Sequence, residues 1–324
     1  MIQSFSYVKA GSLDEAIEHL RAEGARIHAG GTDLLGCLRD DVFEVDRVVS
    51  IAGLEPLKGV REVADGTLKI GALTPLAAVA ADARVRARYP ALAQAAEAVG
   101  TPQLRNQGTL GGNVCQKPRC WYYRGPFPCR RKGGERCYAV SGNNEGHAIF
   151  GGAGCHIVHP SDTAPVLSAL GATAVVAGPG GIRSVPLDDF FVPPRLDPTR
   201  ETVLEAGEVV SELVLPPPGE GLRSSYRKVR GRRAWDFALA GVALALRVDS
   251  SGVVQEAGVV FSGVAPVPWR SRPVERVLTG ERLTEDVVRL AGEVAVESAQ
   301  PLRHNQYKVP LLRGIVEREL AALA

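Results

Sequence analysis

The sequence predicts a globular chain that mixes helices and strands and is divided into two domains, or three small ones. Its 324 residues exceed the usual length of a single domain. Apolar residues make up 45% of the chain and charged residues 23%, which is ordinary for a globular protein with a substantial core. The run Pro216-Pro217-Pro218 interrupts the pattern and marks a linker between the two main parts.

The first stretch, residues 1–57, predicts a small β/α unit. Ser12-Leu13-Asp14-Glu15 is a capping box, in which the serine hydroxyl accepts from a free amide and the glutamate reaches back. The helix that follows ends at Gly24. Residues 26–29 and 47–51 are expected to form short strands.

The second stretch, residues 58–218, predicts strands and helices on both sides of a segment rich in glycine and cysteine. Residues 67–71 alternate apolar and polar side chains, as a strand does. Thr74 is expected to cap a helix that continues through Ala81. Further elements are expected at residues 91–99 (helix), 172–177 (strand) and 209–215 (strand).

The third stretch, residues 221–324, predicts strands followed by helices. Residues 238–248 and 253–264 are apolar, strand-like runs joined by a turn at residues 249–252. Residues 284–298 and 310–323 are helix candidates. This change of pattern after the prolines supports a domain boundary there.

The charge and apolar patterns exclude several classes of protein. A formal net charge of +2 gives no overall attraction to nucleic acid or to a membrane surface. No apolar run approaches the ~18–20 residues that a membrane span needs. The first residues lack a basic segment followed by an apolar one, so a cytoplasmic location is expected. A periplasmic location would require export with a partner that carries a signal.

Five of the six cysteines lie between residues 115 and 155, in a segment that is also basic. Without a secretion signal, a metal or cluster site is favoured over a disulfide framework. Structural zinc sites usually pair cysteines two to four residues apart, and no Cys-x-x-Cys pair occurs here. The wider spacing favours an iron–sulfur cluster. A zinc site and a set of unrelated buried thiols remain alternatives, and Cys37 is expected to serve packing only.

Two glycine loops could hold a dinucleotide. Ala29-Gly30-Gly31-Thr32-Asp33 follows a strand and opens a helix, and Gly108-Thr109-Leu110-Gly111-Gly112-Asn113 has the same character. Paired glycines let backbone amides approach a pyrophosphate. Neither loop is Gly-x-Gly-x-x-Gly, so a NAD-type fold is disfavoured. A tight turn is the alternative for each loop alone.

Two further elements carry polar groups. In His159-Pro160-Ser161-Asp162, the aspartate could accept from a ribose hydroxyl or cap the helix that follows. Residues 226–238 interleave arginine with aromatic residues. That pattern fits a basic edge strand or a patch for an acidic partner, and it is thin support for nucleic-acid binding.

The joint order of these motifs resembles the FAD-binding subunit of the molybdenum hydroxylases, the group of xanthine dehydrogenase, carbon monoxide dehydrogenase and aldehyde oxidoreductase. Gln103-Leu104-Arg105-Asn106-Gln107 and Tyr226-Arg227-Lys228-Val229-Arg230 extend the resemblance nearly from end to end. The cysteine insert resembles the branch with an extra [4Fe–4S] cluster. Within that branch, Arg119-Cys120-Trp121-Tyr122-Tyr123 and His147-Ala148-Ile149 are closer to the aldehyde oxidoreductase type than to 4-hydroxybenzoyl-CoA reductase.

The resemblance implies an α+β fold. A two-part FAD-binding domain would span residues 1–218, with the iron–sulfur insert at about residues 115–157, and a C-terminal domain with a small antiparallel sheet and helices would span residues 221–324. Asp162 would lie towards the adenosine half of FAD, and Lys228 near the flavin ring. The implied cluster ligands are Cys120, Cys129, Cys137 and Cys155. The implied FAD contacts are Arg26, Ile27, His28, Ala29, Gly30, Gly31, Thr32, Asp33, Leu34, Gly108, Thr109, Gly111, Gly112, Asn113, Gln116, Ser161, Asp162 and Lys228.

The implied function is electron transfer, with no catalytic acid or base in this chain. A large partner subunit with a molybdenum cofactor would oxidise the substrate. A small partner with [2Fe–2S] clusters would pass the electrons to FAD here, and FAD would deliver them to an external acceptor. The assembly would be a heterotrimer or a dimer of heterotrimers. The alternatives are a subunit of a 4-hydroxybenzoyl-CoA reductase-like enzyme, a stand-alone flavin oxidase, and a zinc-stabilised binding protein.

Overall fold

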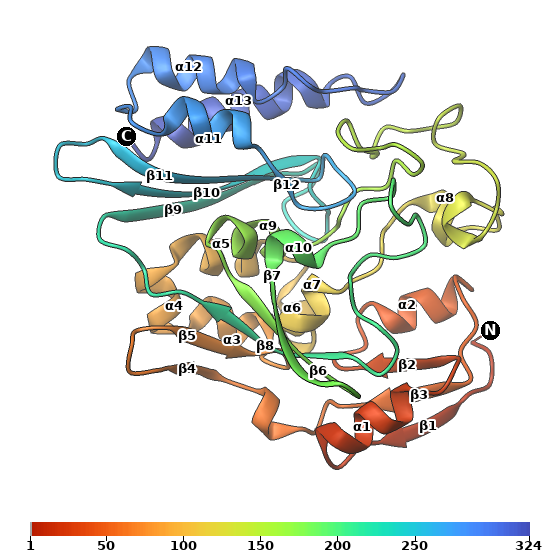
Figure 1. Cartoon of the computed structure of the whole chain (residues 1–324). Coiled ribbons are helices and arrows are strands. Elements are labelled where there is room, and N and C mark those ends of the chain that lie inside the picture. Colours follow the sequence, from red (N-terminus) through yellow and green to blue (C-terminus); the bar gives the residue numbers. More distant parts are fainter. Residues whose placement is uncertain (1) are drawn as a thin grey trace.

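Three β-sheets, each with its own helices, follow one another along the chain in the computed structural model, which describes residues 2–324 (Figure 1). The N-terminal unit lies at one side of the central sheet and its helices, and the C-terminal sheet lies at the other. The architecture is therefore α+β, as expected. Within residues 2–324, no helix is long and apolar enough to cross a membrane.

The N-terminal unit is a parallel three-stranded sheet of order β1-β3-β2. Its strands are β1 (Ser6–Lys9), β2 (Ala25–His28) and β3 (Arg47–Ser50), and its helices are α1 (Leu13–Leu20) and α2 (Leu34–Arg39). The capping box is confirmed: the Ser12 hydroxyl accepts from the Glu15 amide at 3.1 Å, and the Glu15 carboxylate accepts from the Gly11 amide at 2.8 Å. These contacts fix where α1 begins.

The central part is an antiparallel five-stranded sheet of order β4-β5-β8-β6-β7, covered by short helices. Its first strands, β4 (Val60–Glu62) and β5 (Leu68–Gly71), come from the start of this part. The expected cap at Thr74 is wrong, because its hydroxyl donates to the Gly59 carbonyl and the helix starts after Pro75. The other elements are η1 (Glu55–Leu57), α3 (Leu76–Ala81), α4 (Ala83–Arg88), α5 (Pro90–Ala98), α6 (Pro102–Gln107), α7 (Leu110–Val114), α9 (Thr163–Ala169), β6 (Thr173–Gly178), β7 (Gly181–Pro186), α10 (Leu187–Phe190) and β8 (Val209–Leu215).

The cysteine insert lies between α7 and α9 and contains little regular structure. It holds one helical turn, α8 (Trp121–Arg124), and one 3-10 turn, η2 (Arg130–Lys132). Figure 1 shows the insert as a set of loops beside the N-terminal unit and the C-terminal sheet. Its backbone polar groups must therefore be satisfied by side chains and by turns.

The C-terminal part is an antiparallel four-stranded sheet of order β12-β11-β10-β9 that carries three helices on one face. The strands are β9 (Leu222–Val229), β10 (Ala240–Val248), β11 (Val254–Ser262) and β12 (Trp269–Arg270), and the helices are α11 (Arg272–Leu278), α12 (Glu285–Val294) and α13 (Lys308–Ala321). The basic segment that begins at Tyr226 is in part an edge strand, as one interpretation of the sequence expected.

Candidate functional site

The two glycine loops meet at the centre of the molecule. A Cβ atom added to Gly30 would overlap the Gln107 carbonyl, so the first loop lies directly against the residue that precedes the second. Gly31 has φ +73°, a conformation that side chains other than glycine rarely adopt. The Thr109 hydroxyl accepts from the Gly112 amide at 3.2 Å and so fixes the second loop. In the first loop, Gly30 leaves no room for a side chain and Gly31 adopts a backbone conformation that favours glycine.

Both loops line one large cleft with about 3000 Å³ of space between protein atoms, part of it open to solvent. Sixteen of the eighteen residues expected to contact FAD line it. His28 and Ser161 do not line the cleft. Both make contacts just outside it. The His28 Nδ1 atom lies 3.3 Å from the Ser50 hydroxyl. The Ser161 hydroxyl accepts from the Ala164 amide, so Ser161 and not Asp162 caps α9.

Asn113 is held in place by two buried hydroxyls. Its side-chain oxygen accepts from Ser161 and from Thr163, at 2.7 Å each. Its backbone carbonyl accepts from the Gln116 amide group at 2.9 Å. With the oxygen fully engaged, the Asn113 NH₂ group is left as the donor on the cleft side.

Asp162 and Lys228 form a buried ion pair at the wall of the cleft. The ammonium lies 2.7 Å from one carboxylate oxygen, and the Tyr226 hydroxyl donates to the other at 2.7 Å. Burial raises the pKa of Asp162, while Lys228 and the Tyr226 hydroxyl act in the opposite direction. The pair is therefore compact and well satisfied, which a buried charge requires.

This contact brings together two residues for which the resemblance implied separate roles. Asp162 was expected towards the adenosine half of FAD and Lys228 near the flavin ring. The ion pair places both side chains at one wall of the cleft. The two residues face the same part of the cleft, and sequence spacing could not show this because they lie 66 positions apart.

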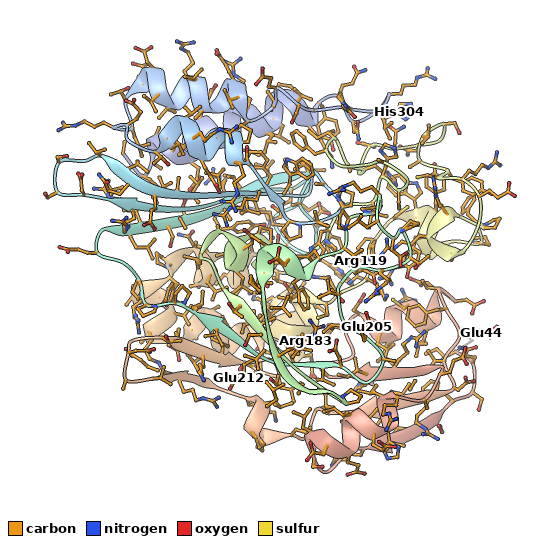
Figure 2. All side chains as sticks on the ribbon, in the orientation of Figure 1. Glu44, Arg119, Arg183, Glu205, Glu212 and His304 are labelled. Atoms are coloured by element: carbon orange, nitrogen blue, oxygen red, sulfur yellow. The ribbon has the colours of Figure 1, made fainter. Side chains whose placement is uncertain are left out.

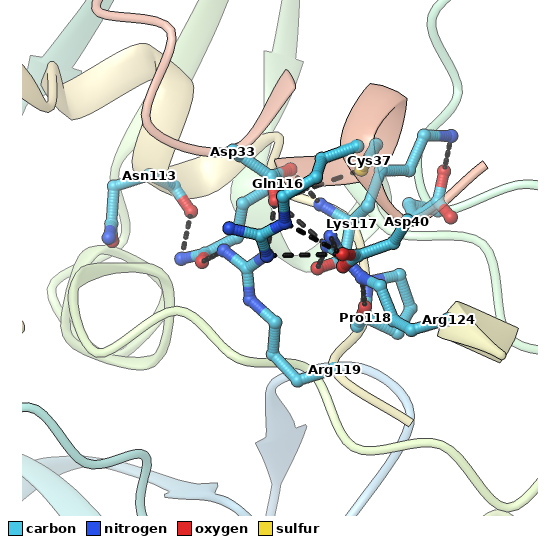
Figure 3. Close-up of polar contacts among 11 residues, drawn as sticks. Asp33, Cys37, Asp40, Asn113, Gln116, Lys117, Pro118, Arg119 and Arg124 are labelled. Atoms are coloured by element: carbon cyan, nitrogen blue, oxygen red, sulfur yellow. Dashed lines mark hydrogen bonds and ion pairs between the residues drawn. The ribbon is translucent and has the colours of Figure 1, made fainter. Parts of the chain in front are cut away.

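Asp33, at the end of the first glycine loop, binds the start of the cysteine insert (Figure 3). One of its carboxylate oxygens accepts from the Lys117 amide at 2.7 Å. The other accepts from the guanidinium groups of Arg119 and Arg124, the latter at 2.9 Å. Figure 2 shows Arg119 in the middle of the molecule, between the N-terminal unit and the C-terminal sheet. Asp33 lines the cleft, but its carboxylate is committed to the insert.

A second buried ion cluster holds the middle of the insert. The Glu201 carboxylate pairs with both Arg131 and Lys117. The Arg131 side chain is only 1% exposed, and its guanidinium lies 5.5 Å from the centre of the Tyr123 ring. Removal of Glu201 would leave the buried Arg131 charge without its carboxylate partner.

Four thiols of the insert line one small cavity, together with His147, Arg130 and Arg131. It has about 280 Å³ of space between protein atoms, part of it open to solvent. They are the four expected ligands, Cys120, Cys129, Cys137 and Cys155. Burial raises the pKa of Cys120 to about 11. The interaction between the neighbouring Cys137 and Cys155 thiols lowers the pKa of Cys137 and raises that of Cys155. No group of three or more His, Cys, Asp or Glu side chains in residues 2–324 is close enough to hold a single metal ion.

The remaining cysteines lie elsewhere. Cys37 is fully buried, packs in one apolar cluster with Tyr123 and Cys129, and also lines the large cleft. Cys115 lines the large cleft and not the cysteine cavity, and burial raises its pKa to about 12.

Several residues of both sites were not predicted as site residues from the sequence. His147 has its Nε2 atom 3.2 Å from the Cys120 sulfur, while its Nδ1 atom is buried without a partner. The sequence indicated Arg119 and Arg124 only as part of a basic segment. It gave no indication of a role for Glu201. Their partners lie far away in the sequence, so no local pattern could have identified them.

The chain matches known proteins over nearly its whole length. Residues 3–218 match the FAD binding domain in molybdopterin dehydrogenase, and residues 224–323 match the CO dehydrogenase flavoprotein C-terminal domain. It is 35% identical to the aldehyde oxidoreductase FAD-binding subunit of Escherichia coli, covering 99% of this chain and 98% of that one. It is 30% identical to the carbon monoxide dehydrogenase medium chain of Hydrogenophaga pseudoflava, with coverages of 98% and 96%. A solved structure of carbon monoxide dehydrogenase from Hydrogenophaga pseudoflava superposes with a TM-score of 0.79 at 27% identity, covering 100% of this chain and 98% of that one.

Proposed function

Because the chain belongs to the family of FAD-binding subunits of molybdenum-dependent dehydrogenases, we propose that it passes electrons from a partner's [2Fe–2S] clusters through FAD to an external acceptor. We propose further that its insert carries a [4Fe–4S] cluster. The observation that carries the proposal is the meeting of two glycine loops, nearly eighty residues apart, at one cleft.

The first glycine loop and the second would hold the FAD pyrophosphate and ribityl chain between them. Gly30, Gly31 and Gly112 present backbone without side chains, so a phosphate could approach their amides closely. The Asn113 NH₂ group is held in one orientation by the hydroxyls on its oxygen. It would donate to the ligand without losing further conformational freedom.

Lys228 would place a positive charge beside the flavin ring. Bound FAD would supply the redox chemistry, and the protein would set its position and potential. A buried ammonium near the ring would favour the reduced, anionic form. The Asp162 carboxylate would hold that ammonium in place, because it accepts from Lys228 on one oxygen and from the Tyr226 hydroxyl on the other.

The cysteine cavity is consistent with a [4Fe–4S] cluster. Four thiolates around one cage are the usual ligand set for such a cluster. Each thiolate would bind a different iron, so the thiols need not converge as closely as they would around a single ion. The Arg130 and Arg131 side chains also line the cavity and would offset negative charge there. The His147 Nε2 atom would donate to the Cys120 sulfur.

The relatives support a role as one subunit of a larger enzyme. Two of them are named medium chains, of carbon monoxide dehydrogenase and of glyceraldehyde dehydrogenase. We propose a large molybdenum subunit and a small [2Fe–2S] subunit as partners of this chain, and an aldehyde as the substrate class of the complex. A stand-alone flavin oxidase is the weaker alternative, because the relatives that this chain matches end to end are named as subunits or medium chains.

Cofactor content tests the proposal directly. We expect about one FAD, four iron atoms and four acid-labile sulfides per chain after anaerobic purification, since four cysteines suit a [4Fe–4S] cage. Cys129→Ser should lose the iron and the sulfide, whereas the matched change Cys37→Ser should keep both. Zinc without sulfide, or equal iron loss in the two variants, would contradict the cluster assignment. Absence of bound flavin would contradict the electron-transfer role.

A further inference from the structure

Asp33 joins the first glycine loop to the start of the cysteine insert, whose residues Lys117, Arg119 and Arg124 line the same cleft. On its N-terminal side, Thr32 and the glycines line the cleft proposed for FAD. On its other side, its carboxylate binds the backbone amide of Lys117 and two arginines of the insert. These contacts span 84 to 91 positions in the sequence. All three hydrogen bonds therefore join the first glycine loop to the insert, and none of them lies within the loop itself.

The insert residues bound by Asp33 also position the cysteine cavity. Arg119 precedes Cys120 directly, and Arg124 ends the turn that begins after Cys120. The Arg124 amide donates to the Cys120 carbonyl at 2.9 Å, and its guanidinium donates to the Pro118 carbonyl at 2.9 Å. The Arg124 side chain is 10% exposed, so these bonds are largely shielded from water. A displacement of Asp33 would therefore move Cys120.

We propose that Asp33 couples FAD binding to the order of the cysteine insert, so that each stabilises the other. Asp33 is a positioning residue in this role, because its carboxylate is bonded to Lys117, Arg119 and Arg124 and the residue does not line the cysteine cavity. Linkage is reciprocal: if an ordered insert favours FAD, bound FAD must favour an ordered insert by the same factor. The inference rests on the proposed function for FAD binding, but not on the identity of the metal centre.

Hydrogen exchange of the unaltered protein provides the first test. The Arg130 amide donates to the Arg136 carbonyl at 3.0 Å and the Gly142 amide donates to the Tyr138 carbonyl at 3.0 Å. None of these residues lines the cleft, so both amides report on the insert itself. Addition of FAD to flavin-free protein should slow exchange of both amides by about tenfold, in the usual range of coupling between sites. If FAD slows exchange only at residues that line the cleft, the coupling does not exist.

A pair of matched variants provides the second test. Asp33→Asn keeps the shape of the side chain but removes the charge that holds Arg119 and Arg124. We expect about tenfold weaker FAD binding and faster loss of iron from the insert. Asp188→Asn is the control, because Asp188 also binds two arginines, Arg270 and Arg272, away from the cleft and the cysteine cavity. Equal effects of the two changes would overturn the proposal.

A double-mutant cycle separates coupling from general destabilisation. Cys129→Ser should weaken FAD binding in the wild-type background, although Cys129 does not line the cleft. In the Asp33→Asn background it should have no further effect, because the connection is already broken. Additive effects would contradict coupling through Asp33. Failure of the wild-type protein to bind FAD would instead contradict the proposed function.

Discussion

Lys308, at the start of α13, is a fully buried lysine with no carboxylate within ion-pair distance among residues 2–324. Its ammonium donates to the carbonyls of Gly263, at 2.7 Å, and Gly146, at 3.2 Å. It thereby ties the C-terminal helix to the end of β11 and to the cysteine insert. Burial lowers its pKa to about 7, because the charged form is poorly solvated there.

The lowered pKa of Lys308 predicts a pH-dependent free energy of unfolding. Between pH 7 and about 10.4, the unfolded chain binds a proton that the folded protein does not. Raising the pH through this window should therefore stabilise the fold, by up to about 1.4 kcal/mol per pH unit. Urea denaturation at pH 7, 8 and 9 measures this slope.

Lys308→Met should remove this contribution, and the exposed Lys9→Met should keep it. The comparison of slopes isolates Lys308 from other groups that titrate in the same range. A slope that is equal in the two variants would show that Lys308 keeps its proton in the folded state throughout. The variant should also be less stable at pH 9 than the wild type, since two buried carbonyls lose their donor.

At the scale of elements, the two glycine loops lie so close together that one added methyl group at Gly30 would force them apart. Gly30→Ala would place a Cβ atom inside the Gln107 carbonyl, so the loops must separate. We expect a loss of stability of about 1–3 kcal/mol and weaker FAD binding. Gly36→Ala is the control, because its Cβ would meet only Arg124 at 3.5 Å, an ordinary contact. Fluorescence titration with FAD measures both. Unchanged affinity in Gly30→Ala would contradict a ligand held between the loops.

Elements with a clear local pattern were predicted correctly, including β8 at residues 209–215, whose partner strands lie far away in the sequence. Elements without such a pattern were missed or misassigned. The capping box of α1 involves only Gly11, Ser12 and Glu15, so it was visible in the sequence. β1 was missed because its residues are mostly exposed and its order comes from pairing with β3. Thr74 was misassigned because its hydroxyl bonds to Gly59, 15 residues away.

The same distinction applies to the site. The glycine loops and the cysteines were recognised because paired glycines and grouped cysteines each indicate a small number of possible functions. The ion pair of Asp162 with Lys228 and the contacts of Asp33 with the insert join residues more than sixty positions apart. Only the fold brings these partners together, so their roles had to be read from the structure.

At the scale of the whole molecule, the central and C-terminal parts share one hydrophobic core. α5 and α9 of the central part pack against β9, β10 and β11 of the C-terminal sheet. Residues of that sheet belong to the core cluster of the central helices. They are Tyr226, Ala243, Ala245 and Val260. The linker after Pro218 therefore joins two parts that are not independent in their packing.

This shared core predicts cooperative unfolding of residues 1–218 with residues 221–324. Separation would expose the apolar faces of α5, α9 and the sheet, at a cost of roughly 25 cal/mol per Å² of apolar surface. Differential scanning calorimetry should therefore show a single transition for the full chain. A fragment of residues 1–218 should aggregate or unfold at a lower temperature than the full chain. Two resolved transitions, one of them matching that fragment, would show instead that the parts fold as separate units with a weak interface.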